Sequence, residues 1–173
     1  MKWFEVKRMV TAFILAGGKS RRMGADKAFM EGGVSRLIAL AESCGAARIV
    51  TLCGSVERAS MFEGEVWPDP PSAKSLMDVL DWVMRQVDDD VQLIPCDAFG
   101  LEQSGLTALM ESGGGTPLDP SGNRQPLLSF CPRGWTTGAS KDSIDSLFSS
   151  LPSLSLVGLE EQMKNFNRPQ HLD

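Results

Sequence analysis

The chain has 173 residues, of which 42% are hydrophobic and 23% charged, and this length suits one domain with a full hydrophobic core. Its net charge of −5 is spread along the sequence without a Lys/Arg-rich stripe, which argues against nucleic-acid binding. No apolar run reaches the ~18 residues of a membrane helix, and residues 1–10 lack the apolar core of a signal peptide. We therefore expect a single cytoplasmic domain over residues 1–173, with residues 1–9 as a loose arm or an upstream start.

Apolar runs and amphipathic segments alternate along the chain. Residues 12–15 are all apolar and enter a tight Ala-Gly-Gly turn, which is typical of a buried strand. The clearest amphipathic helix, over residues 76–87, follows Ser75, which has the capping-box spacing with Asp78. Further strands are expected over residues 48–52, 66–67, 91–94, 126–131 and 154–157. Further helices are expected over residues 37–44, 55–62, 106–110 and 144–151.

This alternation predicts an α/β fold in which helices cover both faces of a mainly parallel sheet. In such folds, ligands bind beyond the carboxyl ends of the strands. Two polar clusters follow predicted strand ends: residues 16–27 after the first strand and Asp97 after the fourth. We expect these clusters to form the functional site.

The cysteines and the histidine do not form a metal-binding pattern. None of the four cysteines belongs to a C-x-x-C pair, and His171 is the single histidine, so a structural zinc site is not expected. Reduced, mostly buried thiols are typical of this pattern in a cytosolic protein. His171 matches no motif and is expected at the surface.

Residues 15–28 read L-A-G-G-K-S-R-R-M-G-A-D-K-A and carry three glycines and four cations directly after a predicted strand. Glycine lets backbone N–H groups turn toward a phosphate, and arginine holds phosphate oxygens through parallel hydrogen bonds. The segment is not a Walker A loop, because Phe13 stands where that motif needs a glycine. By composition alone, a solvated turn with surface charges explains the loop equally well.

The loop resembles the signature L-A-G-G-x-S-x-R-M-G-x-D-K of the molybdenum cofactor guanylyltransferases (the molybdopterin-guanine dinucleotide biosynthesis protein A family) almost position for position. The wider nucleotidyltransferase superfamily shares L-A-G-G and the later lysine, whereas R-M-G-x-D-K points to the molybdopterin branch. Weaker similarities continue over most of the chain. They lie at residues 66–69 (V-W-P-D), 94–97 (I-P-C-D), 125–128 (Q-P-L-L) and 165–169 (N-F-N-R-P).

The resemblance implies a Rossmann-like, three-layer nucleotidyltransferase fold and a Mg²⁺-dependent reaction. The terminal phosphate of molybdopterin would attack the α-phosphate of GTP, pyrophosphate would leave, and the guanine dinucleotide cofactor would form. The work of the protein would be positioning and charge neutralisation. Molybdoenzyme maturation proteins are the partners that the resemblance implies.

The same resemblance assigns roles to single residues. Arg22 and Lys27 would face the phosphates and act in catalysis. Asp97 would act with them by binding Mg²⁺ beside the nucleotide, since Mg²⁺ takes one or two carboxylates together with phosphate oxygens and water. An Asx turn or a helix cap is the alternative role for Asp97. The residues that would line the nucleotide through their backbones are Leu15, Ala16, Gly17 and Gly18.

Other matched positions each have two roles open. Asp69 would contact the nucleotide or serve as a turn residue between two prolines. Asp26 would orient Lys27 or cap the next segment. Asn165 and Asn167 would bind the pterin or, as we favour, tie down the C-terminal loop. Three aromatic rings would stack on a base or a pterin or, as we favour, pack in the core: Trp67, Trp82 and Trp135.

Two segments depart from the family pattern. Residues 74–78 read K-S-L-M-D where the family carries G-P-L-A-G, so guanine recognition or the approach of the pterin is expected to differ. In that position Asp78 needs Lys74 or Mg²⁺ to offset its charge near a triphosphate. The usual asparagine is replaced near Leu52 and Cys53, and Gln125 stands where the family often has histidine. Three alternatives therefore stand beside guanylyl transfer: another nucleotide such as CTP, another acceptor such as a sugar phosphate, and a degenerate paralogue that binds without catalysis.

Overall fold

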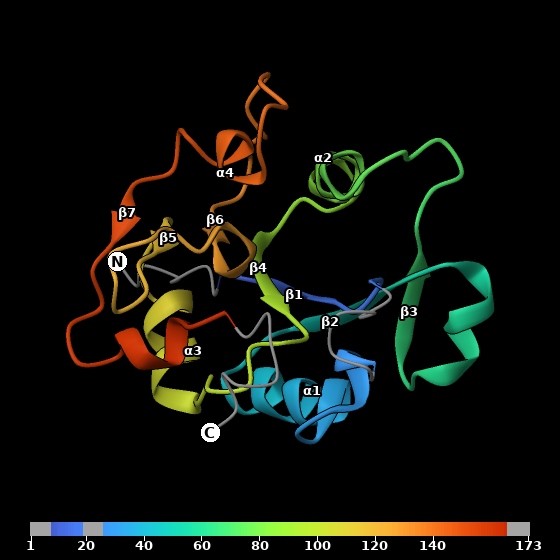
Figure 1. Ribbon diagram of the computed structural model, residues 1–173, viewed down its shortest axis with the longest axis horizontal. Helices are drawn as coiled ribbons and strands as arrows, with labels where there is room; N and C mark the ends of the chain where they lie inside the picture. Colours follow the sequence, from blue (N-terminus) through green and yellow to red (C-terminus); the bar gives the residue numbers. More distant parts are fainter. Residues whose placement is uncertain (1–7, 19–25, 166–173) are drawn as a thin grey trace, which may run out of the picture.

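A five-stranded sheet with helices on both faces forms the centre of the protein (Figure 1). The computed structural model describes residues 8–18 and 26–165. The strands of the sheet are β1 (Val10–Leu15), β2 (Arg48–Gly54), β3 (Glu65–Pro68), β4 (Asp90–Pro95) and β6 (Phe130–Cys131). They lie in the order β3-β2-β1-β4-β6, in which β6 pairs antiparallel with β4 and the other pairs are parallel. The predicted α/β class with a mainly parallel sheet is confirmed.

In the described part of the chain, helices cover both faces of the sheet (Figure 1). The helices α1 (Gly33–Ser43) and α3 (Gln103–Met110) lie on one face, and α2 (Leu76–Gln86) and α4 (Ile144–Leu147) lie on the other. Successive side chains of a strand point to opposite faces, so Ile14 joins the core under α1 and α3, while Phe13 joins the core under α2 and α4. All of β1 is buried because both of its faces are covered.

Short elements complete the connections. A separate two-stranded parallel sheet pairs β5 (Thr116–Pro117) with β7 (Ser153–Leu154). The 3-10 helices are η2 (Lys27–Phe29), η3 (Val56–Met61), η4 (Pro126–Leu128) and η5 (Glu160–Met163). Of these, η2 and η3 follow β1 and β2, so they lie near the carboxyl edge of the sheet where the site was expected.

The N-terminal two thirds of the chain follow the sequence prediction. The strands expected at residues 12–15, 48–52, 66–67 and 91–94 are confirmed as β1, β2, β3 and β4. The helices expected at residues 37–44, 76–87 and 106–110 are confirmed as α1, α2 and α3. The helix expected over residues 55–62 is the 3-10 helix η3, which is shorter and more tightly wound than an α-helix over the whole range. The Ser55 side chain does not cap it.

The C-terminal third departs from the prediction. The strand expected over residues 126–131 is wrong in its first half, because Pro126 begins the 3-10 helix η4 and β6 starts only at Phe130. Proline is well tolerated at the first position of a helix, since the N–H that it lacks would have no hydrogen-bond acceptor within the helix. The helix expected over residues 144–151 ends at Leu147, whose carbonyl accepts the Gly138 N–H. The last strand covers Ser153–Leu154 rather than residues 154–157.

Two further expectations concern an N-terminal arm and the absence of a membrane-spanning helix. Residues 1–7 of the expected N-terminal arm lie outside the described residues, and the Met9 carbonyl accepts the Asp90 N–H beside β4. The longest described helices, α1 and α2, have 11 residues each, and none in the described part is long and apolar enough to cross a bilayer.

Candidate nucleotide site

The carboxyl ends of β1, β2 and β4 meet at one edge of the sheet. Leu15 pairs with Leu52 of β2 and with Pro95 of β4. Beyond the strand ends, the Ala16 N–H donates to the Leu52 carbonyl at 2.9 Å, and the Cys96 N–H donates to the Leu15 carbonyl at 3.1 Å. These bonds continue the ladder, so the Gly-rich loop and the segment around Asp97 leave the sheet side by side.

A close approach of two glycines fixes the start of the loop. A Cβ on Gly17 would lie 2.9 Å from the Gly54 Cα, and a Cβ on Gly54 would lie 2.6 Å from the Gly17 carbonyl oxygen. Gly54 also has a positive φ of 83°, a backbone conformation that residues with a side chain rarely adopt. Leu15 and Ala16 are buried, whereas Gly17 and Gly18 are exposed, so the backbone of these two glycines is open to a ligand.

Lys27 and Asp97 meet at the centre of this edge. The Lys27 Nζ donates to the Asp97 Oδ2 at 2.9 Å, although the residues are far apart in sequence. Their side chains are 17% and 13% exposed, so the pair is largely shielded from water but open on one side. The two charged residues that the resemblance assigns to phosphate and metal are therefore direct neighbours.

Asp26 holds the segment that carries Lys27. Its Oδ1 accepts the Ala28 N–H at 3.0 Å and caps η2, as one of the two sequence interpretations proposed. Its Oδ2 pairs with Arg58 Nη1 at 2.6 Å. Sequence reasoning missed Arg58, since a single arginine in a short helix belongs to no motif.

Asp69 lies at the same edge, at the end of β3. Its N–H donates to the Gly54 carbonyl at 2.7 Å, so Asp69 is tied to the glycine that contacts Gly17. The residue is exposed, yet the neighbouring chain removes enough water to raise the pKa of its carboxyl. Its backbone thus has a structural role at the end of β3.

Cys96 stands next to Asp97 but is not a nucleophile. Burial, with a smaller effect of the Asp97 charge, raises the pKa of the Cys96 thiol to about 12. Burial also raises the pKa of Cys131. Both thiols therefore stay protonated at neutral pH, and thiolate chemistry is not available at this edge from Cys96.

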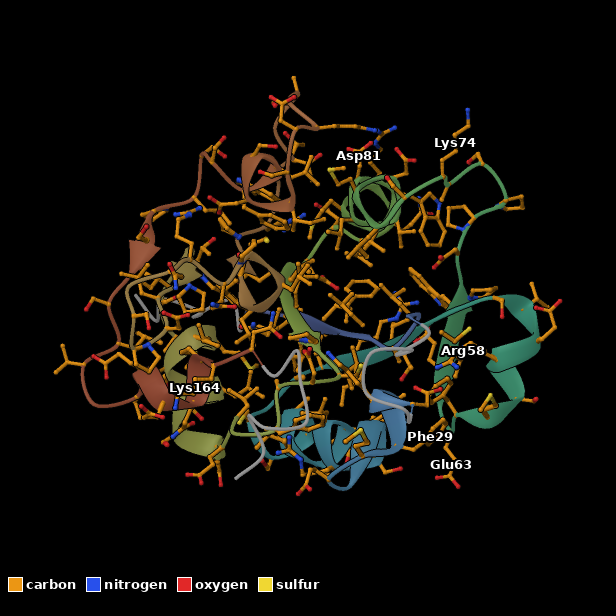
Figure 2. All side chains as sticks on the ribbon, viewed as in Figure 1. Phe29, Arg58, Glu63, Lys74, Asp81 and Lys164 are labelled. Carbon is orange, nitrogen blue, oxygen red and sulfur yellow. The ribbon has the colours of Figure 1, made fainter. Side chains whose placement is uncertain are left out.

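The acidic residue at the start of α2, Asp78, is neutralised by groups from outside the helix. The Ser75 side chain accepts the Asp78 N–H, and Asp78 Oδ2 accepts the Lys74 N–H at 2.9 Å. Asp78 Oδ1 accepts from the Lys141 ammonium at 2.7 Å, and this bond, together with the Lys74 N–H, holds the pKa of Asp78 at about 2. The offset for this charge thus comes from the Lys141 side chain and the Lys74 backbone; the Lys74 side chain points away from the helix in Figure 2.

The remaining predicted residues fall into two groups. The tryptophans pack as favoured: Trp67 lies against Phe13 and Trp82, and Trp135 stacks on Phe148. Asn165 is exposed at the end of the described chain and has no regular structure. Outside the described residues lie Arg22, Asn167 and His171.

The donor set at this edge suits Mg²⁺ better than a softer metal. Among the described residues there is no cluster of three or more His, Cys, Asp and Glu that could enclose an ion. Asp97 offers a carboxylate at a strand end, and the Lys27 contact engages Oδ2. Mg²⁺ is usually held by one or two carboxylates and completed by phosphate oxygens and water. The site can therefore hold a Mg²⁺–phosphate unit, and a chelating cage for zinc is not formed by these residues.

Comparison with known protein families gives one match. Residues 12–138 match the family model of the MobA-like NTP transferase domain. No curated protein matches the sequence.

Several solved structures share the fold at low sequence identity. The protein Aq1419 from Aquifex aeolicus VF5 is 15% identical with a TM-score of 0.71, over 94% of this chain and 95% of that one. Rv0371c from Mycobacterium tuberculosis H37Rv is 15% identical with a TM-score of 0.63, over 86% and 88%. A 4-diphosphocytidyl-2C-methyl-D-erythritol synthase is 14% identical with a TM-score of 0.63, over 97% and 96%. These likenesses establish the fold, and the family match over most of the chain establishes more: the chain belongs to the MobA-like NTP transferase domain family and is a nucleotidyltransferase.

Proposed function

We propose that this nucleotidyltransferase moves GMP from GTP to molybdopterin and releases pyrophosphate, with Mg²⁺ as its cofactor. The observation that carries the proposal is the Lys27–Asp97 pair beside the exposed backbone of Gly17 and Gly18. A cation, a carboxylate and open N–H groups at one strand edge suit a triphosphate with its metal. The preference for GTP and molybdopterin rests on the spelling R-M-G-A-D-K at residues 22–27.

In this reaction an oxygen of the acceptor phosphate attacks the α-phosphorus of the nucleotide. The bond from the α-phosphorus to the bridging oxygen breaks, and that electron pair leaves with pyrophosphate. Mg²⁺, when bound at Asp97, neutralises phosphate charge. Lys27 would hold phosphate oxygens as a compact cation, and the Gly17–Gly18 backbone would fix the direction of the leaving group.

One observation favours a different nucleotide as the second candidate. Lys74, Met77 and Asp78 have larger side chains than the residues at the same places of the G-P-L-A-G turn, and the Asp78 carboxylate accepts the Lys74 N–H just before the Ser75 cap of α2. A helix start that is filled by its own carboxylate leaves less room for a purine base. A cytidylyl transfer, or transfer to a sugar phosphate, is compatible with the same site.

Nucleotide binding tests the proposal directly. We would titrate GTP, CTP, ATP and UTP by calorimetry, each with and without Mg²⁺, and expect selective, Mg²⁺-dependent GTP binding. Pyrophosphate release with GTP should then require molybdopterin. Preference for another nucleotide would move the substrate within the family, and binding without turnover would indicate the degenerate paralogue. No binding to any of the four would overturn the proposal.

A further inference from the structure

Arg58 binds both ends of the Gly-rich loop. Its Nη2 donates to the Ala16 carbonyl at 2.8 Å, where the loop begins. Its Nη1 pairs with Asp26 Oδ2 at 2.6 Å, where the loop returns to η2. Its Nε donates to the Cys53 carbonyl at 3.0 Å, at the end of β2. One arginine, whose side chain is only 12% exposed, therefore joins three segments that surround the site.

An aromatic contact reinforces the same connection. The Arg58 guanidinium lies 5.6 Å from the centre of the Phe62 ring, and Phe62 stacks on Phe29 with ring centres 5.3 Å apart. Phe29 belongs to η2, the helix that begins with Lys27. Arg58, which belongs to η3, and Phe29 lie on the same side of the molecule in Figure 2. The segment that carries Lys27 is thus tied to η3 twice, through Asp26 and through Phe29.

We propose that Arg58 is the positioning residue of the triphosphate site. It sets the distance between the Gly17–Gly18 backbone and the Lys27 ammonium before a nucleotide arrives. This inference rests on the proposed function, because it assigns a purpose to the loop that Arg58 holds. A planar fork with five donors holds its acceptors in fixed directions, whereas a lysine ammonium is a compact charge with rotatable donors on a flexible stem.

The geometry argues for positioning rather than for direct contact with the ligand. Three Arg58 donors are already engaged by protein acceptors, namely the carbonyls of Ala16 and Cys53 and the Asp26 carboxylate. Arg58 therefore acts on Lys27 through Asp26, and on the glycines through Ala16. Displacing such groups by about 1 Å can lower a rate by about 100-fold.

The test compares nucleotide affinity in four proteins: the unmodified chain, Arg58→Gln, Lys27→Met and the double variant. The probe is the nucleotide that the unmodified chain binds best, with Mg²⁺. We expect Arg58→Gln to raise the Kd about 10-fold or more. The double variant should lose less affinity than the product of the two single losses, because Arg58 works partly through Lys27.

Arg124→Gln is the matched control. Arg124 is also partly buried, pairs with Asp145 at 2.8 Å, and donates to the carbonyls of Phe148 and Leu151 at 2.9 and 3.1 Å. These contacts tie α4 to its neighbours, away from the Gly-rich loop. A general loss of packing should therefore appear in both arginine variants, and a loss of affinity only in Arg58→Gln.

A measurement without ligand tests the clamp itself. In Arg58→Gln, hydrogen exchange at the amides of Ala16, Ala28 and Phe29 should accelerate, while the amides of β4 stay protected. If Arg58→Gln does not fold, Arg58→Lys replaces it, since it keeps the charge beside Asp26 and lacks the fork.

The outcomes separate this inference from the proposed function. If the unmodified chain binds no nucleotide, the proposed function and the inference both fail. If the unmodified chain binds and Arg58→Gln binds equally well, the inference alone fails. Strictly multiplicative losses in the double variant, or an equal loss in Arg124→Gln, would show that Arg58 only stabilises the fold.

Discussion

Two pairs of opposite charges lie at the carboxyl edge of the sheet. Lys27 pairs with Asp97, and Arg58 pairs with Asp26, at 2.9 and 2.6 Å. Pairing lowers the cost of keeping charges partly out of water, and it holds each group near the place where the proposed ligand would need it. The Lys27–Asp97 contact would have to loosen when phosphate and metal arrive, since both ligands compete for the same two groups.

Replacing either member of this pair should affect ligand binding more than folding. We expect Lys27→Met to weaken nucleotide binding by about 10-fold or more, and Asp97→Asn to abolish Mg²⁺-dependent turnover. Each change should lower the free energy of unfolding by no more than about 1–3 kcal/mol, because the remaining partner is still partly solvated. Calorimetry, pyrophosphate release and chemical denaturation measure these effects.

Lys164→Met is the control for Lys27→Met, since Lys164 belongs to an exposed pair with Glu161. It should leave the nucleotide affinity unchanged. Metal dependence that survives Asp97→Asn would place the metal elsewhere.

The Asp78–Lys141 pair should show in the acid stability of the protein. The pKa of Asp78 is held at about 2 in the fold, below its ordinary value of 3.8. A depressed folded pKa stabilises the protein above the ordinary pKa, and that contribution is lost as the pH falls through about 2. The difference in unfolding free energy between the unmodified chain and Asp78→Asn should therefore be constant above pH ~4 and shrink toward pH ~2.

Denaturant unfolding across this pH range checks that expectation. An NMR titration of the Asp78 carboxyl gives the same answer independently, and Lys141→Met should return its pKa toward the ordinary value. A difference that grows toward low pH would contradict the pair as the cause.

At the scale of elements, the contact between Gly17 and Gly54 decides how the loop leaves the sheet. The backbone after β1 lies directly on Gly54, the last residue of β2, so that neither glycine has room for a Cβ. The Gly54 carbonyl in turn accepts the Asp69 N–H after β3. Backbone contacts thus connect the ends of three neighbouring strands, in addition to the bonds that Arg58 donates to the Ala16 and Cys53 carbonyls.

Gly54→Ala separates this close approach from the cost of backbone conformation. Gly64 has a similar φ of 79°, and a Cβ added there would meet nothing within 4 Å, so Gly64→Ala measures the conformational cost by itself. We expect about 1–2 kcal/mol of destabilisation for Gly64→Ala and about 1–3 kcal/mol more for Gly54→Ala. Urea unfolding of both variants measures these losses of unfolding free energy. Equal losses would mean that the backbone at Gly17 can move away from an added Cβ without destabilising the fold.

The elements that the sequence predicts well are those with a clear hydrophobic pattern of their own. Residues 12–15 and 76–87 carry their own periodic pattern, so β1 and α2 were predicted from local sequence. The strand expected over residues 126–131 failed at Pro126 because its short apolar run fits a 3-10 turn as well as a strand.

The site shows the same division between local motif and distant contact. Lys27 and Asp97 were predicted because each stands in a recognisable motif at a strand end. Arg58 was not, because its three acceptors come from segments that only the fold brings together. Contacts of this kind leave no spacing in the sequence by which to find them.

At the scale of the whole molecule, the sheet separates two hydrophobic cores. Leu37 of α1 belongs to the core on one face, and Leu80 of α2 belongs to the core on the other. Both cores share β1 and β4, whose side chains alternate between them. Because the two cores share these strands, we expect them to unfold together, as in a single domain.

Truncating a leucine in either core tests this coupling. Leu37 and Leu80 are both fully buried, so we expect Leu37→Ala and Leu80→Ala each to cost about 2–5 kcal/mol. Each variant should shift one common unfolding transition, seen by calorimetry and by circular dichroism. Two separate transitions, with each variant moving only one of them, would contradict the single-domain prediction.

The two edges of the main sheet also have a consequence for association between chains. β3 at one edge has four residues and ends at Pro68, while β6 at the other has two residues and is followed by Pro132. Proline offers no N–H to an incoming strand, and Gly115 already bridges to Phe130 beside β6. Neither edge therefore presents a long row of free backbone groups, and the sheet is guarded against growing by strand addition into aggregates.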